Sequence, residues 1–430
     1  MRSSTRSWLL GCSLCLGGAA GAQNFAWDVR PISGLGGNEA YVVDLDDLGR
    51  VYLNSPLPGG YETRGYIEDH GTIRFIGGLG DPLVASRMNA RGEIRGVGRD
   101  ELQRTYVYRN GVAIPLVAPG ETTMAGGQAL GPNDRGQMVT TYRMQDESYR
   151  TSIIQPDGRF VDIGTLGGHA TWAIAMNQSG QVAGISNLPG TLGAQPTHAF
   201  LYANGTMTDL GTLGGSQSNA RDLNERGQVL GEASTGNEWH AFVYDNGTMT
   251  DLGTLGGAVS VSADLNDLGH AVGHSDLDPA QSSEDSHAFL YRDGQMIDLD
   301  PLFADSNSSF ATRINNAGQV LATAMVTDRR FNTRAAHLFF YDNGQAIDLT
   351  DYMRTSFNDV LNIEGAWLNE AGQIALRTSI AGETHIFLMT PVPEPTTWAL
   401  LLAGAAALAV AGRRRQVSQY RFTRFSYSSC

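Results

Sequence analysis

The chain has 430 residues, of which 41% are hydrophobic and 17% are charged, and its formal net charge is −14. A normal hydrophobic content favours a folded protein, and the 53 glycines follow no collagen-type period. Seven of the 30 basic residues but only one of the 44 acidic residues lie at the two ends, so residues 24–390 carry a net charge near −20. Such a charge disfavours nucleic acid and anionic lipid as partners.

The N-terminal residues 1–22 have the three parts of a secretory signal peptide. Arg2 and Arg6 provide the positive charge, and residues 8–16 form the apolar run. The predicted cleavage site consists of small residues, Ala20, Gly21 and Ala22. An alternative is a lipobox ending at Cys12, whose cysteine would become a lipidated N-terminus. We therefore expect an exported protein.

The segment 23–390 contains no cysteine, because Cys12 and Cys15 lie in the leader and Cys430 is the last residue. It can form neither an internal disulfide nor a thiolate metal site. Its stability must come from packing and from hydrogen bonds between strands.

A unit of about 45 residues is repeated eight times along this segment. The clearest copies begin with His-Ala-Phe at His198, His240 and His287 and continue through Asn-Gly or Asp-Gly to Asp-Leu. The His-Ala-Phe position recurs at Arg64, Arg104, Arg150, His198, His240, His287, His337 and His385. This pattern closely resembles the HAF repeats of predicted extracellular bacterial proteins.

Two hairpin signals occur in each unit and predict four short strands. The first is Asn-x-x-Gly, in which Asn and Gly tolerate the positive φ of a tight turn. Its copies start at Asp46, Asn89, Asn133, Asn177, Asn224, Asn266, Asn315 and Asn369. The second is an Asn-Gly or Asp-Gly pair, at positions 110, 157, 204, 246, 293 and 343.

Four strands in about 45 residues is the size of a propeller blade, so we predict an all-β protein, a β-propeller of about eight four-stranded blades. A seven-bladed ring and an open β-solenoid are the alternatives. The last unit stops after 384–388 and lacks its fourth strand, whereas residues 25–32 supply a spare one. The N-terminal strand is therefore expected to close the ring and remove two exposed edges.

The repeated histidines could suggest a ring of metal ligands, but a propeller places equivalent positions on separate blades. We expect instead a hydrogen bond between strands. The Gly-Thr-Leu-Gly-Gly copies at 164, 211 and 253 lack the lysine and helix of a phosphate loop, and are interpreted as blade-to-blade connections.

No catalytic, zinc or cofactor motif is present in the sequence. Fragments of a calcium loop suggest at most a surface calcium site. The acidic residues concerned are Asp44, Asp46 and Asp47, and Asp276, Asp278, Glu284 and Asp285.

The C-terminal segment 391–415 has three parts. The first is the motif Pro393, Glu394 and Pro395. An apolar run at 396–412 follows, which as a helix would span about 25 Å of the bilayer's roughly 30 Å core. A cytoplasmic arginine cluster closes it, Arg413, Arg414 and Arg415. This order closely resembles the PEP-CTERM sorting signal, which implies recognition and cleavage by an exosortase.

The 15-residue tail 416–430 departs from that pattern, because such proteins usually stop at the arginine cluster. An uncleaved C-terminal membrane anchor is the alternative. The expected route runs through the secretion machinery to the inner membrane of a Gram-negative-type bacterium, and then to the cell surface or extracellular matrix.

The leading functional hypothesis is a non-enzymatic structural or binding protein for exopolysaccharide or another surface partner. Aromatic residues that could stack on sugars are Trp172, Trp239 and Trp367. The alternatives are an extracellular carbohydrate-active enzyme, a glycosidase or polysaccharide lyase, with carboxylates clustered where the repeat is broken, and a purely structural protein.

Overall fold

The computed structural model describes residues 26–33, 40–56, 63–76, 84–89, 91, 93–97, 105–109, 112–116, 129–190, 196–278, 286–328, 333–357, 361–380 and 382–392. Contacts group Val29–Thr390 into one compact unit, and a second unit consists of Met1–Asp28 and Pro391–Cys430.

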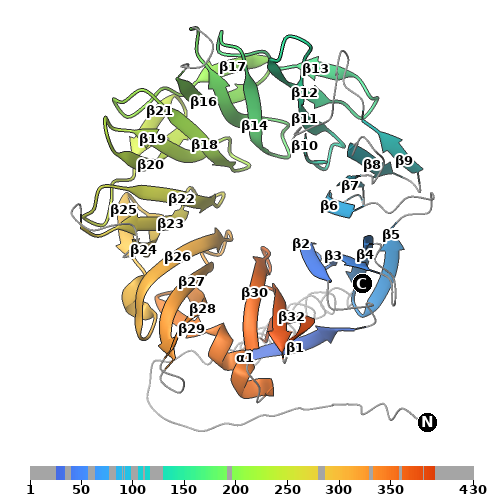
Figure 1. The fold of residues 1–430 in the computed structure, drawn as a ribbon, viewed down its shortest axis with the longest axis vertical. Coiled ribbons are helices and arrows are strands. Elements are labelled where there is room, and N and C mark those ends of the chain that lie inside the picture. Colours follow the sequence, from blue (N-terminus) through green and yellow to red (C-terminus); the bar gives the residue numbers. More distant parts are fainter. Residues whose placement is uncertain are drawn as a thin grey trace, which may run out of the picture. The chain divides into compact units, whose positions relative to one another are not determined.

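Eight four-stranded sheets form the blades of a ring (Figure 1). In blades 1–7 the four strands are consecutive in sequence and antiparallel. Blade 1 contains β2 (Tyr41–Leu45), β3 (Val51–Pro56), β4 (Thr63–Asp69) and β5 (Thr72–Ile76), and blade 2 contains β6 (Val84–Met88), β7 (Ile94–Val97), β8 (Thr105–Arg109) and β9 (Val112–Pro115). Blade 3 contains β10 (Ala129–Leu130), β11 (Met138–Arg143), β12 (Tyr149–Ile154) and β13 (Phe160–Asp162). Blade 4 contains β14 (Thr171–Met176), β15 (Val182–Asn187), β16 (Thr197–Ala203) and β17 (Thr206–Asp209).

Blade 5 contains β18 (Ser218–Leu223), β19 (Val229–Ser234), β20 (Trp239–Asp245) and β21 (Thr248–Asp251). Blade 6 contains β22 (Ser260–Leu265), β23 (Ala271–Asp276), β24 (Ser286–Arg292) and β25 (Gln295–Asp298). Blade 7 contains β26 (Ser306–Ile314), β27 (Val320–Asp328), β28 (Thr333–Asp342) and β29 (Gln345–Asp348). A 3₁₀ turn, η2 (Asp300–Leu302), precedes blade 7, and helix α1 (Leu349–Phe357) follows it.

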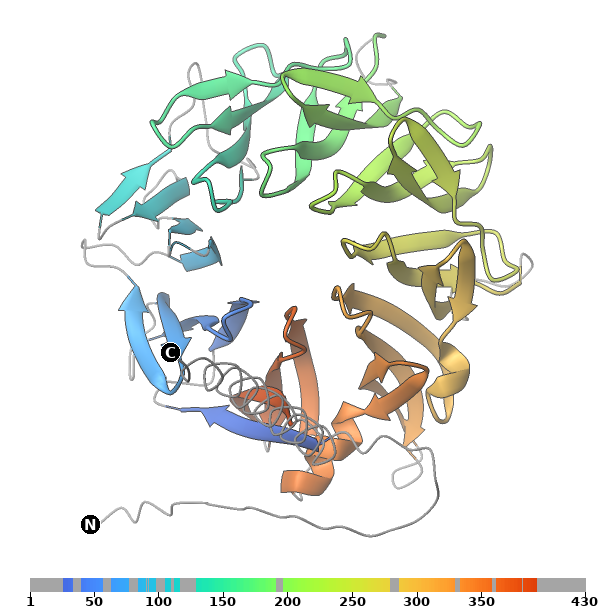
Figure 2. The same cartoon turned by 180° about the vertical axis from the view of Figure 1, so that it is seen from behind.

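Blade 8 is completed by the N-terminal strand, as predicted. Its sheet order is β1 (Ala26–Ile32), β32 (Glu383–Val392), β31 (Ile374–Ile380) and β30 (Leu361–Leu368). Ile32 of β1 shares a buried cluster with Ile386 and Leu388 of β32. Figure 2 shows β1 along the outer side of the last blade. The eight-bladed propeller is confirmed.

The hairpin between the third and fourth strands forms as expected in blades 4–7. Both central residues have positive φ, as a type I′ turn requires: Asn204/Gly205, Asn246/Gly247, Asp293/Gly294 and Asn343/Gly344. Blade 1 makes the same turn with His70 and Gly71, which is not one of the predicted Asn-Gly or Asp-Gly pairs.

The Asn-x-x-Gly turns differ from the prediction in one respect. Only the glycine has positive φ, for example +82° at Gly227, whereas Asn224 acts through its side chain. Asn224 Oδ1 accepts hydrogen bonds from the backbone N of Arg226 and Gln228, at 3.1 and 2.9 Å. Its Nδ2 donates to Asn266 O of blade 6 at 2.9 Å.

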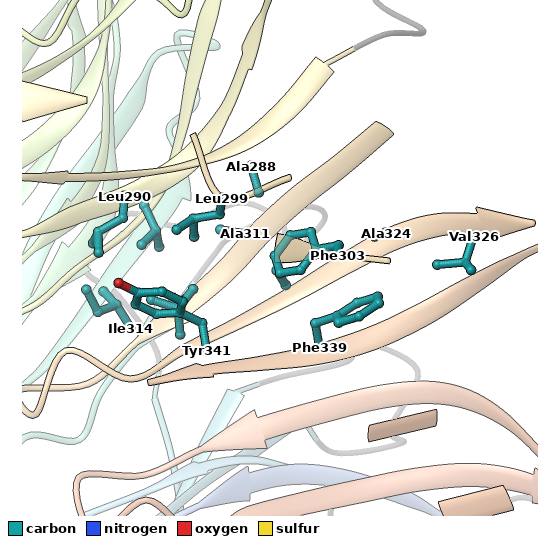
Figure 3. Close-up of a cluster of buried hydrophobic side chains, with 13 residues drawn as sticks. Ala288, Leu290, Leu299, Phe303, Ala311, Ile314, Ala324, Val326, Phe339 and Tyr341 are labelled. Atoms are coloured by element: carbon teal, nitrogen blue, oxygen red, sulfur yellow. The ribbon is translucent and has the colours of Figure 1, made fainter. Parts of the chain in front are cut away.

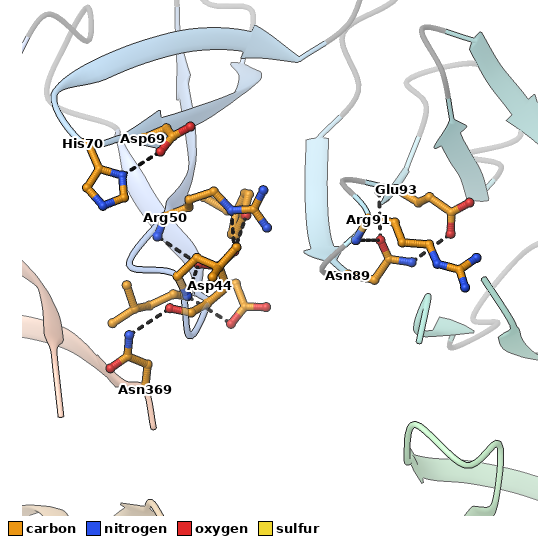
Figure 4. Close-up of polar contacts among 12 residues, drawn as sticks. Asp44, Arg50, Asp69, His70, Asn89, Arg91, Glu93 and Asn369 are labelled. Atoms are coloured by element: carbon orange, nitrogen blue, oxygen red, sulfur yellow. Dashed lines mark hydrogen bonds and ion pairs between the residues drawn. The ribbon is translucent and has the colours of Figure 1, made fainter. Parts of the chain in front are cut away.

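This inter-blade bond is repeated around the ring, and we call the series the asparagine ladder. Among the described residues, seven such bonds run from one turn to the next: Asn89 to Asn133, Asn133 to Asn177, Asn177 to Asn224, Asn224 to Asn266, Asn266 to Asn315, Asn315 to Asn369, and Asn369 to Asp46. The last crosses the seam between blades 8 and 1, where Figure 4 shows Asn369 directed at blade 1.

The hydrophobic core lies between adjacent blades rather than in one central mass. The cluster in Figure 3 combines Leu290 of blade 6, Phe303 of the connection, and Phe339 and Tyr341 of blade 7. The Phe of each clear His-Ala-Phe triplet is fully buried: Phe200, Phe242 and Phe289. A Cβ at the facing glycines, Gly184, Gly231 and Gly273, would lie 2.0 Å from a backbone carbonyl oxygen of the neighbouring strand and 2.8–2.9 Å from that ring, so both the strand and the ring require glycine there.

Replacing Asn224 by Ala is expected to lower the free energy of unfolding by about 3 kcal/mol. The change leaves two turn N–H groups and the carbonyl of Asn266 without their partner, and unsatisfied buried groups cost about 1–3 kcal/mol each. Chemical denaturation of the variant measures the effect, with exposed Asn237→Ala as the control. Equal stability of the two variants would contradict a structural role for the ladder.

Candidate binding pocket between blades 7 and 8

A bridging hydroxyl joins neighbouring blades at the regular interfaces. The backbone N of the alanine in His-Ala-Phe donates to a serine Oγ at the start of the next blade. The pairs are Ala199–Ser218, Ala241–Ser260 and Ala288–Ser309, at 2.9, 2.9 and 3.0 Å. The serine brings the innermost strand of one blade against the third strand of its neighbour.

The interface between blades 7 and 8 is built differently. In blade 8, Ile363 lies where the other blades have the bridging serine. Ser218 pairs with Ala233 on the second strand of blade 5, and Ile363 pairs with the equivalent residue of blade 8, Thr378. The missing hydroxyl comes from Thr350 of α1, whose Oγ1 accepts from Leu338 N at 2.9 Å. Helix α1 packs against both β28 and β30. The helix therefore bridges the two strands.

A cavity of about 360 Å³ lies at this interface. Blade 7 supplies Thr312, Arg313, Thr323, Ala336, His337 and Leu338, and blade 8 supplies Ile363, Glu364, Gly365 and Ala366. The volume is in the range of small-ligand sites, about 300–1,000 Å³. The lining mixes hydroxyls and charged groups with aliphatic surface.

His337 is the most buried of the His-Ala-Phe histidines that pair with an aspartate, with its side chain 3% exposed against 16–17% for His198, His240 and His287. In all four, Nδ1 contacts an aspartate at the end of the neighbouring strand, at 2.6–3.0 Å. The predicted hydrogen bond between strands is confirmed in these blades.

His337, Asp348 and Asp351 are close enough to share a metal ion, and no other such group occurs in the described part of the chain. Arg354 Nη1, however, lies 3.2 Å from His337 Nε2. A guanidinium only donates, so Nε2 accepts this bond and Nδ1 donates to Asp348. Both ring nitrogens are thus engaged, and the arginine occupies the position that a cation would need.

Two interacting carboxyl groups, Asp222 and Asp264, lie on the innermost strands of blades 5 and 6. Each follows a β-bulge, and each accepts from the backbone of the next blade: Leu265 N to Asp222 at 3.0 Å and Ile314 N to Asp264 at 2.8 Å. The carboxyl groups also hydrogen-bond to each other, which requires a shared proton. Burial, then the charge of Asp222, raises the pKa of Asp264 to about 7.

The Asp222–Asp264 pair follows the repeat, because each aspartate lies two residues before the ladder asparagine of its own blade and after the same bulge. Glycosidases need carboxyl groups about 5 Å or more apart, so that a sugar or water fits between them. Asp222 and Asp264 are in direct contact. Their bonds to neighbouring blades give the pair a structural role at the blade junctions.

An acidic rim accompanies the asparagine ladder. In blades 3–8, the residue after the ladder asparagine donates its backbone N to the equivalent side chain of the next blade, as in Glu225 N to Asp267 Oδ1 at 2.9 Å and Glu370 N to Asp47 Oδ1 at 3.0 Å. Burial, and after it the neighbouring carboxylates, raises the pKa of both Glu225 and Glu370. The rim contains Asp47, Asp134, Gln178, Glu225, Asp267, Asn316 and Glu370.

The three tryptophans lie on different blades. Trp172 is on β14, with its ring 5.5 Å from that of Tyr149. Trp239 begins β20, and Trp367 of β30 packs against a core cluster at the seam. The Trp367 ring lies behind Gly365, so it supports the pocket wall without lining it. The structure does not gather them into one stacking surface.

The suggested calcium carboxylates are bound to protein groups. Asp44 accepts from Leu45 N, Asp46 from Arg50 and Tyr52, and Asp47 from Glu370 N. Asp276 accepts from Ser286, whereas Glu284 and Asp285 lie outside the described residues. The Gly-rich segments after Asp209 and Asp251 connect β17 to β18 and β21 to β22, as predicted.

The features predicted at the two ends fall outside the described residues. They are the signal peptide with Ala20 and Ala22, Pro393–Pro395, the segment 396–412 and Arg413–Arg415. Within the described part of the chain, α1 falls short of the length and apolar character that a membrane-crossing helix needs.

Residues 391–415 match the PEP-CTERM protein-sorting motif. The motif implies export, sorting to the surface and processing by an exosortase. No curated protein matches the chain. The chain thus combines a β-propeller with a C-terminal PEP-CTERM sorting motif.

Solved structures with a similar fold have low sequence identity. The β-propeller domain of the trilobed protease from Pyrococcus furiosus, with an open velcro topology, is 13% identical over 73% of this chain and 98% of that chain, with a TM-score of 0.45. The acylaminoacyl peptidase of Pyrococcus horikoshii is 14% identical over 79% and 57%, also at 0.45. The BP39L lectin of Burkholderia pseudomallei is 9% identical over 73% and 100%, at 0.34.

The Asp222–Asp264 pair is expected to make the propeller less stable as the pH rises from about 4 to 7. The folded protein keeps the shared proton in this range while the unfolded chain releases it, so stability falls, by up to about 4 kcal/mol. Asp264→Asn preserves both hydrogen bonds without titrating, and should remove this contribution.

Denaturation at several pH values measures the difference between the wild type and this variant. Asp157→Asn, at an exposed turn, is the matched control. A wild-type curve parallel to that of Asp264→Asn would show that the two carboxyl groups do not share a proton.

Proposed function

We propose that this protein is a non-enzymatic component of the cell surface or extracellular matrix, where its propeller binds the exopolysaccharide of the producing cell. The observation that carries the proposal is the sorting motif at 391–415, which directs the propeller outside the cell.

The properties of the propeller support a binding role. Its blades are locked together by the asparagine ladder, so its surface is rigid and pre-organised, which lowers the entropic cost of binding. The pocket between blades 7 and 8 offers hydroxyl, carboxylate and guanidinium groups to a polyhydroxylated ligand.

Co-sedimentation of the purified full chain with the producer's own exopolysaccharide tests the proposal. We expect saturable binding that survives moderate salt, because the negative body excludes simple charge attraction to an acidic polymer. Tryptophan-to-alanine variants at 172, 239 and 367 test the predicted stacking in parallel. Retention no greater than that of an unrelated acidic protein would refute the proposal.

A further inference from the structure

We propose that the pocket between blades 7 and 8 binds one neutral sugar residue of a glycan chain, with Arg313 and Glu364 recognising its hydroxyl groups. This inference rests on the proposed function and identifies its site and ligand class. The pocket lies where the repeat is interrupted, because α1 replaces the Gly-rich loop and Ile363 replaces the bridging serine.

The polar part of the lining suits hydroxyl groups. Arg313 carries guanidinium donors, and its Nη1 uses one of them on Thr312 O at 2.9 Å. Glu364 offers carboxylate acceptors and is held by Arg377 at 3.3 Å. Thr323 adds a hydroxyl that can donate or accept. A sugar hydroxyl both donates and accepts, so it can use a donor on one wall and an acceptor on the other.

The apolar part suits the C–H faces of a pyranose ring. Ala336 and Leu338 lie on the blade 7 side, and Ile363 and Ala366 on the blade 8 side. A ligand with polar edges and apolar faces would match both parts of this lining. The volume of about 360 Å³ fits a small group and not a folded partner.

Local charge favours a neutral ligand over an acidic one. Burial raises the pKa of both Asp222 and Asp264, whereas the positive charge of Arg313 lowers it, so Arg313 already acts on a carboxyl pair of this chain. Arg377 is paired with Glu364, and Arg354 lies between His337 and Asp351. No cation among these is left to neutralise a carboxylate on the ligand. The negative charge of the body adds to this discrimination.

A blocking variant is available from the repeat itself. Ala336 precedes the His-Ala-Phe position of blade 7 and is exposed, and the equivalent residue in blade 5 is Trp239. Ala336→Trp therefore places a side chain that the blade already accepts elsewhere into the mouth of the pocket. The matched control is Thr197→Trp, at the same position of blade 4.

The test titrates the full chain with neutral hexose oligosaccharides and with oligouronates, by calorimetry. We expect neutral oligosaccharides to bind at least tenfold more tightly than oligouronates. Ala336→Trp should lower that affinity at least tenfold, and Thr197→Trp should leave it unchanged. Glu364→Gln should weaken binding severalfold while melting temperature and circular dichroism stay near wild type.

The outcomes separate the two proposals. Exopolysaccharide binding that is unchanged in Ala336→Trp would overturn this pocket as the site while leaving the proposed function in place. Oligosaccharide binding that Ala336→Trp abolishes, without exopolysaccharide binding, would support the pocket and refute the proposed function. Tighter binding of oligouronates, or no binding of either oligosaccharide class, would overturn the assignment of a neutral sugar.

Discussion

The asparagine ladder is the constraint on which the rest of the propeller depends. One buried side chain per turn satisfies two N–H groups of its own turn and the carbonyl of the next turn, as Asn224 does. Because the acceptor is the next ladder residue itself, each bond fixes the position of the following donor. The series continues across the seam from Asn369 to Asp46, so the ring is linked through polar contacts as well as through strand pairing.

Blades 1 and 2 show how the ladder tolerates substitution. Asp46 cannot donate, and its carboxylate instead accepts from Arg50 Nε at 2.6 Å and Tyr52 Oη at 2.7 Å. In blade 2, Glu93 replaces the usual glutamine, and Arg109 pairs with it. In these two blades, hydrogen bonds and ion pairs of charged side chains replace some of the bonds that neutral amides make in the other blades. A protein without cysteine in its body thus relies on many such polar contacts for its cohesion.

The fold could be predicted from the sequence because its signals are local and repeated. Asn-Gly and Asp-Gly pairs predict tight hairpin turns, and four of the six pairs form type I′ turns. The eightfold repetition of the whole unit made the blade pattern clear. The role of the ladder asparagines could not be predicted in the same way. Turn propensity favours Asn for its backbone, whereas its side-chain bond to the next blade depends on a tertiary approach between Asn224 and Asn266 that no local pattern encodes.

The pocket escaped prediction for the opposite reason, since it is made by residues that do not repeat. Ile363, Glu364 and Arg313 belong to no recognisable sequence motif. His337, which also lines the pocket, occupies the same repeat position as the histidines with a structural role. A signal did exist: Asn315 and Asn369 are 54 residues apart, whereas the other ladder steps span 42–49 residues. That extra length is helix α1, which separates the two blades. Where repeats supply stability, the longest departure from the repeat is the place to look for function.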